Sequence, residues 1–290
     1  MHTNETEEAV KVARAEHAGA CYGVQRALDM AHEVAASSER AYTLGPLIHN
    51  PVVVRELEDA GVHQVDEVEA LDAGSGAPVI IRSHGVTPQV RDALEATGLS
   101  IHDATCPHVL RAQKASAQLA KDGCRVIVVG EAGHPEVEGL VAHALAAGGQ
   151  VAVAACADQV PSDLQAPIGV VVQTTQRREA LEEVLSAIRA QGIEPQVKDT
   201  VCDATRERQE AAATMAREVD AVVVIGGRNS ANTTHLAEVC ATVCPRTFHI
   251  QDAAEIDPAW FADCETVGVT AGASTPESQI QAVIALLESL

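Results

Sequence analysis

The hydrophobic positions of the chain fall into short, continuous runs of valine and isoleucine. Two such runs are VIVVG at 126–130 and VVVIG at 222–226, and each leads into a polar turn. Further runs open the segments PVIIRSHGVTPQV, IGVVVQTTQRREAL and TVGVTAGASTPESQ. Unbroken apolar runs are typical of strands that are buried on both faces. The segments between them have helical periodicity, so the pattern predicts the α/β class, with parallel sheets and flanking helices.

One unit of this pattern occurs three times along the chain. Shifting the sequence by 96 residues places Cys106 on Cys202, and shifting it by 85 places Cys21 on Cys106. The turn positions that align in this way are His49, His134 and Ser230, followed two residues later by Pro51, Glu136 and Asn232. Such internal repeats indicate repeated structural units. We therefore expect three similar lobes in a pseudo-threefold arrangement, at residues 10–100, 101–195 and 196–290.

Three of the eight cysteines, Cys21, Cys106 and Cys202, lie in polar turns directly before helical segments. The N-terminus of a helix favours a thiolate. Around a pseudo-threefold axis, three thiolates can hold a zinc ion with an open position or three irons of a [4Fe–4S] cluster. The alternative is that they are remnants of duplication, packed in the core. Core packing is the prediction for the other five, which are Cys124, Cys156, Cys240, Cys244 and Cys264.

The turns that follow the apolar runs contain hydrogen-bond donors and almost no lysine or arginine. Their polar members are His49, His84, His134, Glu136, Thr174, Thr175, Ser230, Asn232 and Ser274. Imidazoles and uncharged donors at helix N-termini suit a diphosphate group. Glu136 is a candidate proton donor, because its surroundings can tune the pKa of a carboxyl group. Alternatively, each histidine is a surface residue, and Glu136 only complements the helix dipole.

Composition narrows the possible partners and the compartment. The 290 residues include 20 Lys and Arg against 41 Asp and Glu, for a net charge of −21. This balance argues against nucleic-acid binding, which depends on neutralising phosphates. No apolar run has the length of a membrane span, and the polar, acidic start is unlike a signal peptide. We therefore expect a cytoplasmic protein with reduced cysteines.

Five motifs, in order, carry a resemblance to a known family. They are DATCP, GHPEVEG, QTT, NSANT and GVTAGAST, and they accompany the three cysteines that precede helices. Together they resemble the 4-hydroxy-3-methylbut-2-enyl diphosphate reductases, which complete the methylerythritol phosphate route to isoprenoid precursors. The resemblance extends from Cys21 to Ser274. Each motif alone is weak, whereas the ordered combination is specific.

The resemblance implies a [4Fe–4S] cluster held by Cys21, Cys106 and Cys202 at the centre of the three lobes, with one open iron that takes the substrate's hydroxyl. It assigns the substrate diphosphate to positions matching His49, His84, His134, Ser230, Asn232 and Ser274. It makes Glu136 the proton-delivery residue, working with Thr174 and beside His134. Electrons would come singly from ferredoxin or flavodoxin, and the products would be isopentenyl and dimethylallyl diphosphate.

Two positions depart from the family pattern. Tyr22 follows the first cysteine, where a small residue is commoner, and Ala231 stands where a second serine is frequent. Neither position is a matched ligand, so they bear on efficiency more than on the class of reaction.

Two other functions stay open at this point: a quinolinate-synthase-like iron–sulfur lyase, and a cluster-bearing sensor or binding protein without catalytic activity.

Overall fold

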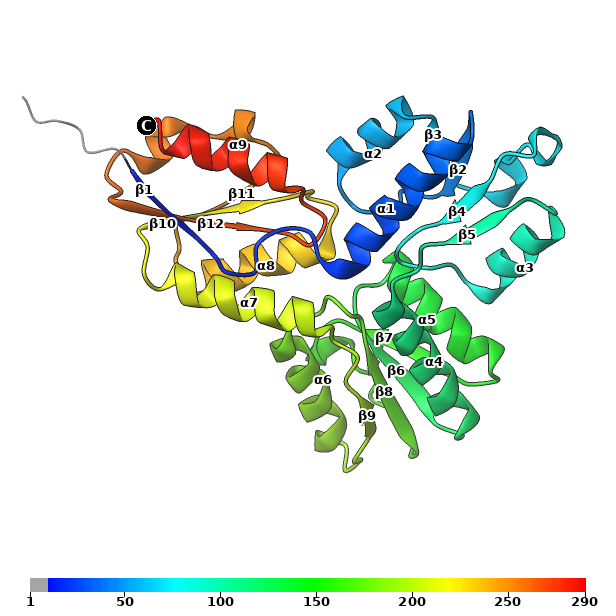
Figure 1. The fold of residues 1–290 in the computed structure, drawn as a ribbon. Coiled ribbons are helices and arrows are strands. Elements are labelled where there is room, and N and C mark those ends of the chain that lie inside the picture. The colour runs from blue at the N-terminus through cyan, green and yellow to red at the C-terminus, as the bar shows by residue number, and fades with distance from the viewer. Residues whose placement is uncertain (1–9) are drawn as a thin grey trace, which may run out of the picture. The chain divides into compact units, whose positions relative to one another are not determined.

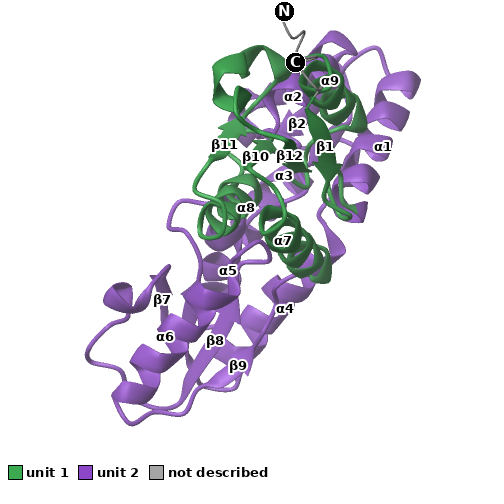
Figure 2. Cartoon of the chain, turned by 90° about the vertical axis from the view of Figure 1, so that its left-hand side faces the viewer, with its two compact units in different colours: residues 1–21, 203–290 green, residues 22–202 purple. Residues whose placement is uncertain are grey.

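A computed structural model describes residues 10–290 of the chain, which form three parallel four-stranded sheets with flanking helices (Figure 1). The expected α/β class is confirmed. The chain divides into two compact units, one of residues 22–202 and one that joins residues up to Cys21 to residues 203–290 (Figure 2). Among the helices of residues 10–290, none combines the length and the apolar character that crossing a membrane requires.

The unit of residues 22–202 contains two of the sheets. The first has the strand order β3–β2–β4–β5, with β2 at Ala41–Leu44, β3 at Val62–Val65, β4 at Val79–Ile81 and β5 at Ile101–Asp103. Its helices are α1 at Tyr22–Ser37, α2 at Pro51–Asp59 and α3 at Pro88–Ala96. The second has the order β7–β6–β8–β9, with β6 at Arg125–Val129, β7 at Val151–Ala154, β8 at Ile168–Val172 and β9 at Gln196–Lys198. Its helices are α4 at Pro107–Lys121, α5 at Pro135–Ala146 and α6 at Arg178–Ala190.

The other unit contains the third sheet, which has the order β1–β12–β10–β11. Its strands are β1 at Lys11–Arg14, β10 at Ala221–Ile225, β11 at Thr247–Ile250 and β12 at Thr266–Ala271. Its helices are α7 at Asp203–Ala216, α8 at Ala231–Ala241 and α9 at Glu277–Leu287. Read from the opposite edge, this order repeats that of the other two sheets, with β1 in the place of β5 and β9.

One edge strand of each sheet, β5, β9 or β1, comes from outside the residue range that the repeat predicted for that lobe. Strand β5 belongs to the first sheet and β9 to the second, although both fall just after the lobe boundaries expected at residues 100 and 195. Strand β1, expected in lobe one, pairs with β12 of the last sheet. Each of these strands leads into one of the three cysteines, so the repeating unit ends with a strand that precedes its cysteine.

The valine and isoleucine runs form the centres of the sheets. In β6, Val126 to Val129 are all fully buried, and β10 and β8 are buried along their whole length. Helices that cover both faces exclude water from the two central strands, which explains why these strands are apolar without alternation. Small aliphatic side chains dominate the centres of the sheets, so the strands can pack closely against helices rich in alanine.

The polar turns all leave the carboxyl ends of central strands. In each of the first two sheets one central strand leads to the strand at one edge and its neighbour leads to the strand at the other, which creates a topological switch point; in the third sheet β10 leads to the edge strand β11, whereas β12 leads into helix α9. Open parallel sheets bind ligands in the crevice at this point. The turns after β2, β4, β6, β8, β10 and β12 carry, in order, His49, His84, His134, Thr174, Ser230 and Ser274.

Candidate active site

Three histidines from three different turns of one unit lie against one another. The rings of His49 and His84 have centroids 4.3 Å apart, and each of these rings lies 5.5 Å from the ring of His134. One ring nitrogen from each of the three lies within 4.8 Å of the others. The structure therefore brings together the three histidines that were predicted from separate sequence motifs.

Burial favours the neutral form of two of these imidazoles, His49 and His84. Desolvation lowers the pKa of His49, and the nearby Arg82 lowers it further. Desolvation, followed by His49, His134 and Arg82, lowers the pKa of His84 well below its ordinary value. Arg82 was not among the residues expected at the site, where almost no lysine or arginine was predicted. Its half-buried guanidinium disfavours protonation of the histidines before an anion arrives.

The hydrogen bond that begins helix α5 determines the tautomer of His134. Its Nδ1 accepts a hydrogen bond of 3.1 Å from the backbone N–H of Glu136. The Nδ1 atom is therefore unprotonated, and the neutral ring carries its proton on Nε2. His134 thus combines two functions: it caps the helix with one nitrogen and keeps an N–H donor on the other.

This tautomer distinguishes an anion from a metal ion as the ligand of the three histidines. A zinc ion needs a lone pair from each imidazole. In His134 one lone pair already accepts the capping hydrogen bond and the other nitrogen is protonated, so zinc binding would require either an imidazolate or a broken cap. An anion needs only N–H donors, and the arrangement suits an anion better.

Glu136 lies next to this cluster and is almost completely buried, with 1% of its surface exposed. Its two carboxyl oxygens accept hydrogen bonds from Thr174, one of 2.6 Å from the backbone N–H and one of 2.8 Å from Oγ1. Burial raises the pKa of Glu136 to about 7, and the two bonds from Thr174 partly oppose this rise. A carboxyl group with this pKa can both hold and release a proton near neutral pH.

Each of the three cysteines that precede helices is partly exposed and is tied through its backbone to a polar turn. The N–H of Cys106 donates to the carbonyl of Ser83 at 2.9 Å, and the N–H of Cys202 donates to that of Thr174 at 3.0 Å. In the other unit, the N–H of Cys21 donates to the carbonyl of Ala273 at 3.2 Å. The positions of the cysteines therefore depend on the turns that carry His84, Thr174 and Ser274.

Side chains also hold the segments that lead into the cysteines. Before Cys106, Asp103 accepts hydrogen bonds from the backbone N–H and the hydroxyl of Thr105. Arg26 of helix α1 donates to the carbonyls of Thr105 and Asp103, both at 3.2 Å. In the other unit, the buried Arg208 of helix α7 donates to the carbonyl of Gly19 at 2.8 Å. These two arginines were not singled out from the sequence, since their role appears only in the tertiary structure.

Three further polar residues from the sequence motifs lie in the unit that contains β10 and β12. Ser230 caps helix α8 by accepting from the N–H of Thr233 at 3.4 Å. Asn232 and Ser274 are buried, with 6% of the surface of each exposed. The Nδ2 atom of Asn232 has no hydrogen-bond partner among residues 10–290. A buried amide N–H without a partner is unfavourable unless a ligand completes it.

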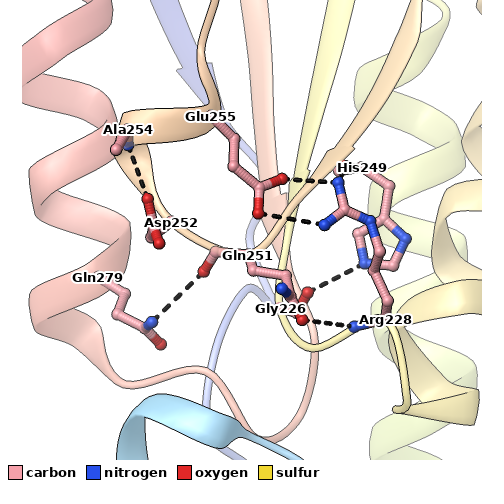
Figure 3. Close-up of polar contacts among 8 residues, drawn as sticks. All are labelled: Gly226, Arg228, His249, Gln251, Asp252, Ala254, Glu255 and Gln279. Atoms are coloured by element: carbon pink, nitrogen blue, oxygen red, sulfur yellow. Dashed lines mark hydrogen bonds and ion pairs between the residues drawn. The ribbon is translucent and has the colours of Figure 1, made fainter.

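A network of polar contacts fixes the start of the turn that carries Ser230 (Figure 3). Arg228 donates to both carboxyl oxygens of Glu255, at 3.1 and 2.6 Å, and its backbone N–H donates to Gln251. The ring of His249 contacts the carbonyl of Gly226 at 3.0 Å. The bidentate ion pair is partly exposed, so it stabilises the turn mainly through its fixed geometry.

Some sequence-based expectations differ from the structure. The repeat aligns His49 with the helix-capping His134, but the residue that caps helix α2 is Asn50, whose Oδ1 accepts from the N–H groups of Val52 and Val53. Counted from the first helical residue, the counterpart of Glu136 in the first sheet is therefore Val52 and not Pro51. Of the five cysteines expected in the core, Cys124, Cys240 and Cys244 are buried, and Cys264 packs against the apolar cluster of the third sheet. For Cys156 the expectation is wrong, because it is partly exposed at a short turn.

Proteins of known sequence resemble the chain over nearly its whole length. A protein of Pelobacter propionicus named 4-hydroxy-3-methylbut-2-enyl diphosphate reductase is 48% identical over 277 residues, which cover 95% of this chain and 96% of that protein. The protein of the same name from Geobacter sulfurreducens is 47% identical over 276 residues, with coverage of 95% and 96%.

Solved structures show the same fold. One described as (E)-4-hydroxy-3-methyl-but-2-enyl diphosphate reductase, the terminal enzyme of the non-mevalonate pathway, superimposes with a TM-score of 0.71 at 40% identity and covers 97% of this chain and 100% of its own. A reductase from Plasmodium falciparum gives a TM-score of 0.88 at 24% identity, covers 96% of this chain and 88% of its own, and supports the fold alone. The model of the LytB protein family matches residues 12–288. The chain therefore belongs to the LytB protein family.

Proposed function

We propose that this chain reduces 4-hydroxy-3-methylbut-2-enyl diphosphate to isopentenyl and dimethylallyl diphosphate, the last step of the non-mevalonate route to isoprenoid precursors. The reaction breaks the bond between C4 and the hydroxyl oxygen, consumes two electrons and two protons, and releases one water. The names of relatives that are 48% and 47% identical support the substrate and the reaction. The observation in this structure that supports it most strongly is Glu136, buried and bonded to Thr174 beside three histidines.

We assign Cys21, Cys106 and Cys202 as the residues that would hold a [4Fe–4S] cluster. All eight cysteines lie in the described residues, and no disulfide joins any of them. The three assigned ones share partial exposure, a place at a helix start and a backbone tie to a polar turn. When bound, the cluster supplies single electrons and a Lewis-acidic iron that has no protein ligand.

The diphosphate group would bind to His49, His84, His134, Ser230, Asn232 and Ser274. Two of these residues have buried nitrogens without a hydrogen-bond partner in the described residues, namely His84 at Nδ1 and Asn232 at Nδ2. An unsatisfied buried group of this kind costs about 1–3 kcal/mol, which phosphate oxygens would recover. His134 adds its Nε2 proton, because its Nδ1 is held by the helix cap. Neutral donors bind the anion without requiring buried positive charges.

Glu136 would deliver a proton to the reduced substrate. With a pKa of about 7, a large fraction of its carboxyl groups is protonated at neutral pH. Thr174 holds both carboxyl oxygens in place, and the cap from His134 fixes the first turn of helix α5, so the position of the acid depends on these neighbours. Deep burial also excludes bulk water from the proton donor.

Two electrons per turnover would come singly from an external protein, for which ferredoxin and flavodoxin are the candidates. Eight cysteines without disulfides fit a reducing, cytoplasmic environment, which we propose as the location of the enzyme.

Anaerobic purification followed by iron and sulfide analysis tests the proposal. We expect about four iron and four sulfide per chain, and conversion of the substrate when dithionite and methyl viologen supply electrons. A colourless protein that contains only zinc would contradict the proposed cofactor. Turnover without any reductant would indicate a lyase, and tight diphosphate binding without turnover would indicate a sensor.

A further inference from the structure

Helix α4 differs in charge from every other α-helix of the described residues. Its sequence, PHVLRAQKASAQLAK, contains three of the 20 lysines and arginines and none of the 41 acidic residues. Each of the other eight α-helices in residues 10–290 contains at least one aspartate or glutamate. In a chain with a net charge of −21, one helix without acidic side chains creates a local surface of the opposite sign.

The cations of α4 face solvent on one side of the helix. The buried side consists of Val109, Ala112, Gln113, Ser116, Leu119 and Ala120. The exposed side chains are Pro107, Leu110, Arg111, Lys114, Gln118 and Lys121, which recur at helical spacing. The first acidic residue in this direction is Asp122, which follows the helix and accepts a hydrogen bond from Gln118. The first two turns of the exposed side are therefore purely cationic and apolar.

Arg111 and Lys114 have no ion-pair partner among residues 10–290. By contrast, Arg189, Arg228 and Arg246 each lie within 3 Å of a carboxylate oxygen. Two unpaired cations one turn apart are therefore available to an external partner.

Exposed apolar side chains accompany these cations at the start of the helix. Leu110 is one of five large hydrophobic residues that the described surface exposes, and Tyr22, which is 72% exposed, is another. Tyr22 lies one turn before Arg26 on helix α1, and Arg26 donates to the carbonyl of Thr105, next to Cys106. Both apolar residues thus lie within four residues of a cysteine that we assign to the cluster.

We propose that the first two turns of α4, with Arg111 and Lys114 as cationic contacts and Leu110 as an apolar contact, form the docking surface for an acidic, one-electron iron–sulfur carrier. The inference rests on the proposed function, which requires two single-electron deliveries. Helix α4 begins directly after Cys106, so Leu110 and Lys114 lie about 6 and 12 Å along the helix axis from that cysteine. In each encounter the reduced carrier gives one electron to the cluster and leaves oxidised.

Charge complementarity selects an acidic carrier. An acidic protein meets repulsion from most of this surface and attraction at α4, which orients the encounter toward Cys106. The exposed side chain of Leu110 can then form the apolar centre of a small, short-lived interface. An interface of this kind has a weak affinity that depends strongly on salt.

A double charge reversal tests the proposal with the intact holoenzyme. The test variant is R111E/K114E, and the control is R40E/R55E, which changes the net charge equally at two exposed arginines outside α4. The probe is a plant-type [2Fe–2S] ferredoxin. Binding of its oxidised form is measured by isothermal titration calorimetry at low salt, and the rate with its reduced form is compared with the rate that dithionite and methyl viologen support. A milder variant, R111Q/K114Q, is measured in the same way in case the reversal unfolds the helix.

We expect R111E/K114E to weaken ferredoxin binding and to raise the KM for ferredoxin by about tenfold, with unchanged iron content and unchanged turnover on dithionite. The control variant should change both ferredoxin values by less than about twofold. Equal effects of the two double variants, or no effect of either, would overturn the docking surface. Absence of turnover in the unmodified enzyme on dithionite would instead contradict the proposed function, which keeps the two failures distinct.

Discussion

The turns that begin helices α5 and α8 occupy equivalent places in two sheets and differ in what they can do chemically. Both begin with a side chain that caps the helix, His134 in one and Ser230 in the other. Both place a polar residue second in the helix. In α5 this residue is Glu136, whose two carboxyl oxygens are occupied by Thr174, whereas in α8 it is Asn232, whose Nδ2 has no partner in the described residues.

In the α5 turn, the buried carboxyl group of Glu136 takes its hydrogen-bond partner, Thr174, from a second turn. The cysteine anchors identify the equivalent residues, because Cys202 bonds to the carbonyl of Thr174 and Cys21 to that of Ala273. Only Thr174 has a hydroxyl for a carboxylate, and Ala273 has none. The repeated fold therefore provides structurally equivalent positions at the starts of α5 and α8. Only the position in α5 holds a buried carboxyl group, and Thr174 from a second turn binds that group.

The largest expected effect comes from making the two turns alike. In the variant Glu136→Asn the α5 turn takes the residue of the α8 turn and loses its carboxyl proton. We expect kcat to fall by about 10²- to 10⁴-fold, because general acid catalysis contributes an effect of this size. Glu138→Gln, an exposed change in the same turn of α5, is the matched control and should retain normal turnover. Steady-state kinetics with dithionite would refute the acid if both variants behaved alike.

Removal of the amide from the other turn should act on binding rather than on chemistry. Asn232→Ala deletes a donor that we assign to the diphosphate. A hydrogen bond to a charged group contributes about 1.5–3 kcal/mol, so KM should rise at least about tenfold. The value of kcat should change by only a few fold. If kcat fell as strongly as in Glu136→Asn, the two turns would not have separate functions.

The two functions of His134 can be separated by two replacements. His134→Ala removes both the helix cap and the Nε2 donor, whereas His134→Asn supplies another side chain that caps helices well. We expect the alanine variant alone to lose about 1 kcal/mol of unfolding free energy. Both variants should raise KM for the substrate. Equal stability of the two proteins in urea denaturation would show that the capping bond does not matter.

A smaller effect is expected from the partner of the acid. Thr174→Val keeps the backbone N–H bond to Glu136 and removes the bond from Oγ1. That hydroxyl bond stabilises the ionised carboxylate and lowers the pKa of Glu136, so its loss should raise this pKa further. The pH dependence of kcat should then move toward alkaline pH, by less than about one unit. A shift toward acid pH would contradict this arrangement.

The sequence was sufficient to predict the three sheets and the proximity of the three histidines. Continuous runs such as Val126 to Val129 predict buried parallel strands, and the threefold spacing of cysteines predicts which turns are equivalent. These properties are local, or they repeat along the chain, and therefore appear in the residues themselves.

Other features depend on contacts that the sequence does not reveal. Strand β1 is four residues long and has no strong apolar run, so its pairing with β12, more than 250 residues away, could not be predicted. Helix α2 begins one residue later than the alignment of His49 with His134 implies, because Asn50 caps it. The effect of Arg82 on the histidines and the raised pKa of Glu136 both result from burial in the folded chain.

The pH dependence of kcat in the wild-type enzyme and in Glu136→Gln tests the central claim most directly. The active form of Glu136 is protonated, and its pKa is about 7, so the wild-type rate should fall as pH rises through about 7. The glutamine variant keeps the shape of the side chain but has no proton to donate. We expect it to retain its iron and sulfide, with a small rate that does not change across this pH range. Full turnover in this variant, or the same fall in rate above neutral pH, would contradict the account.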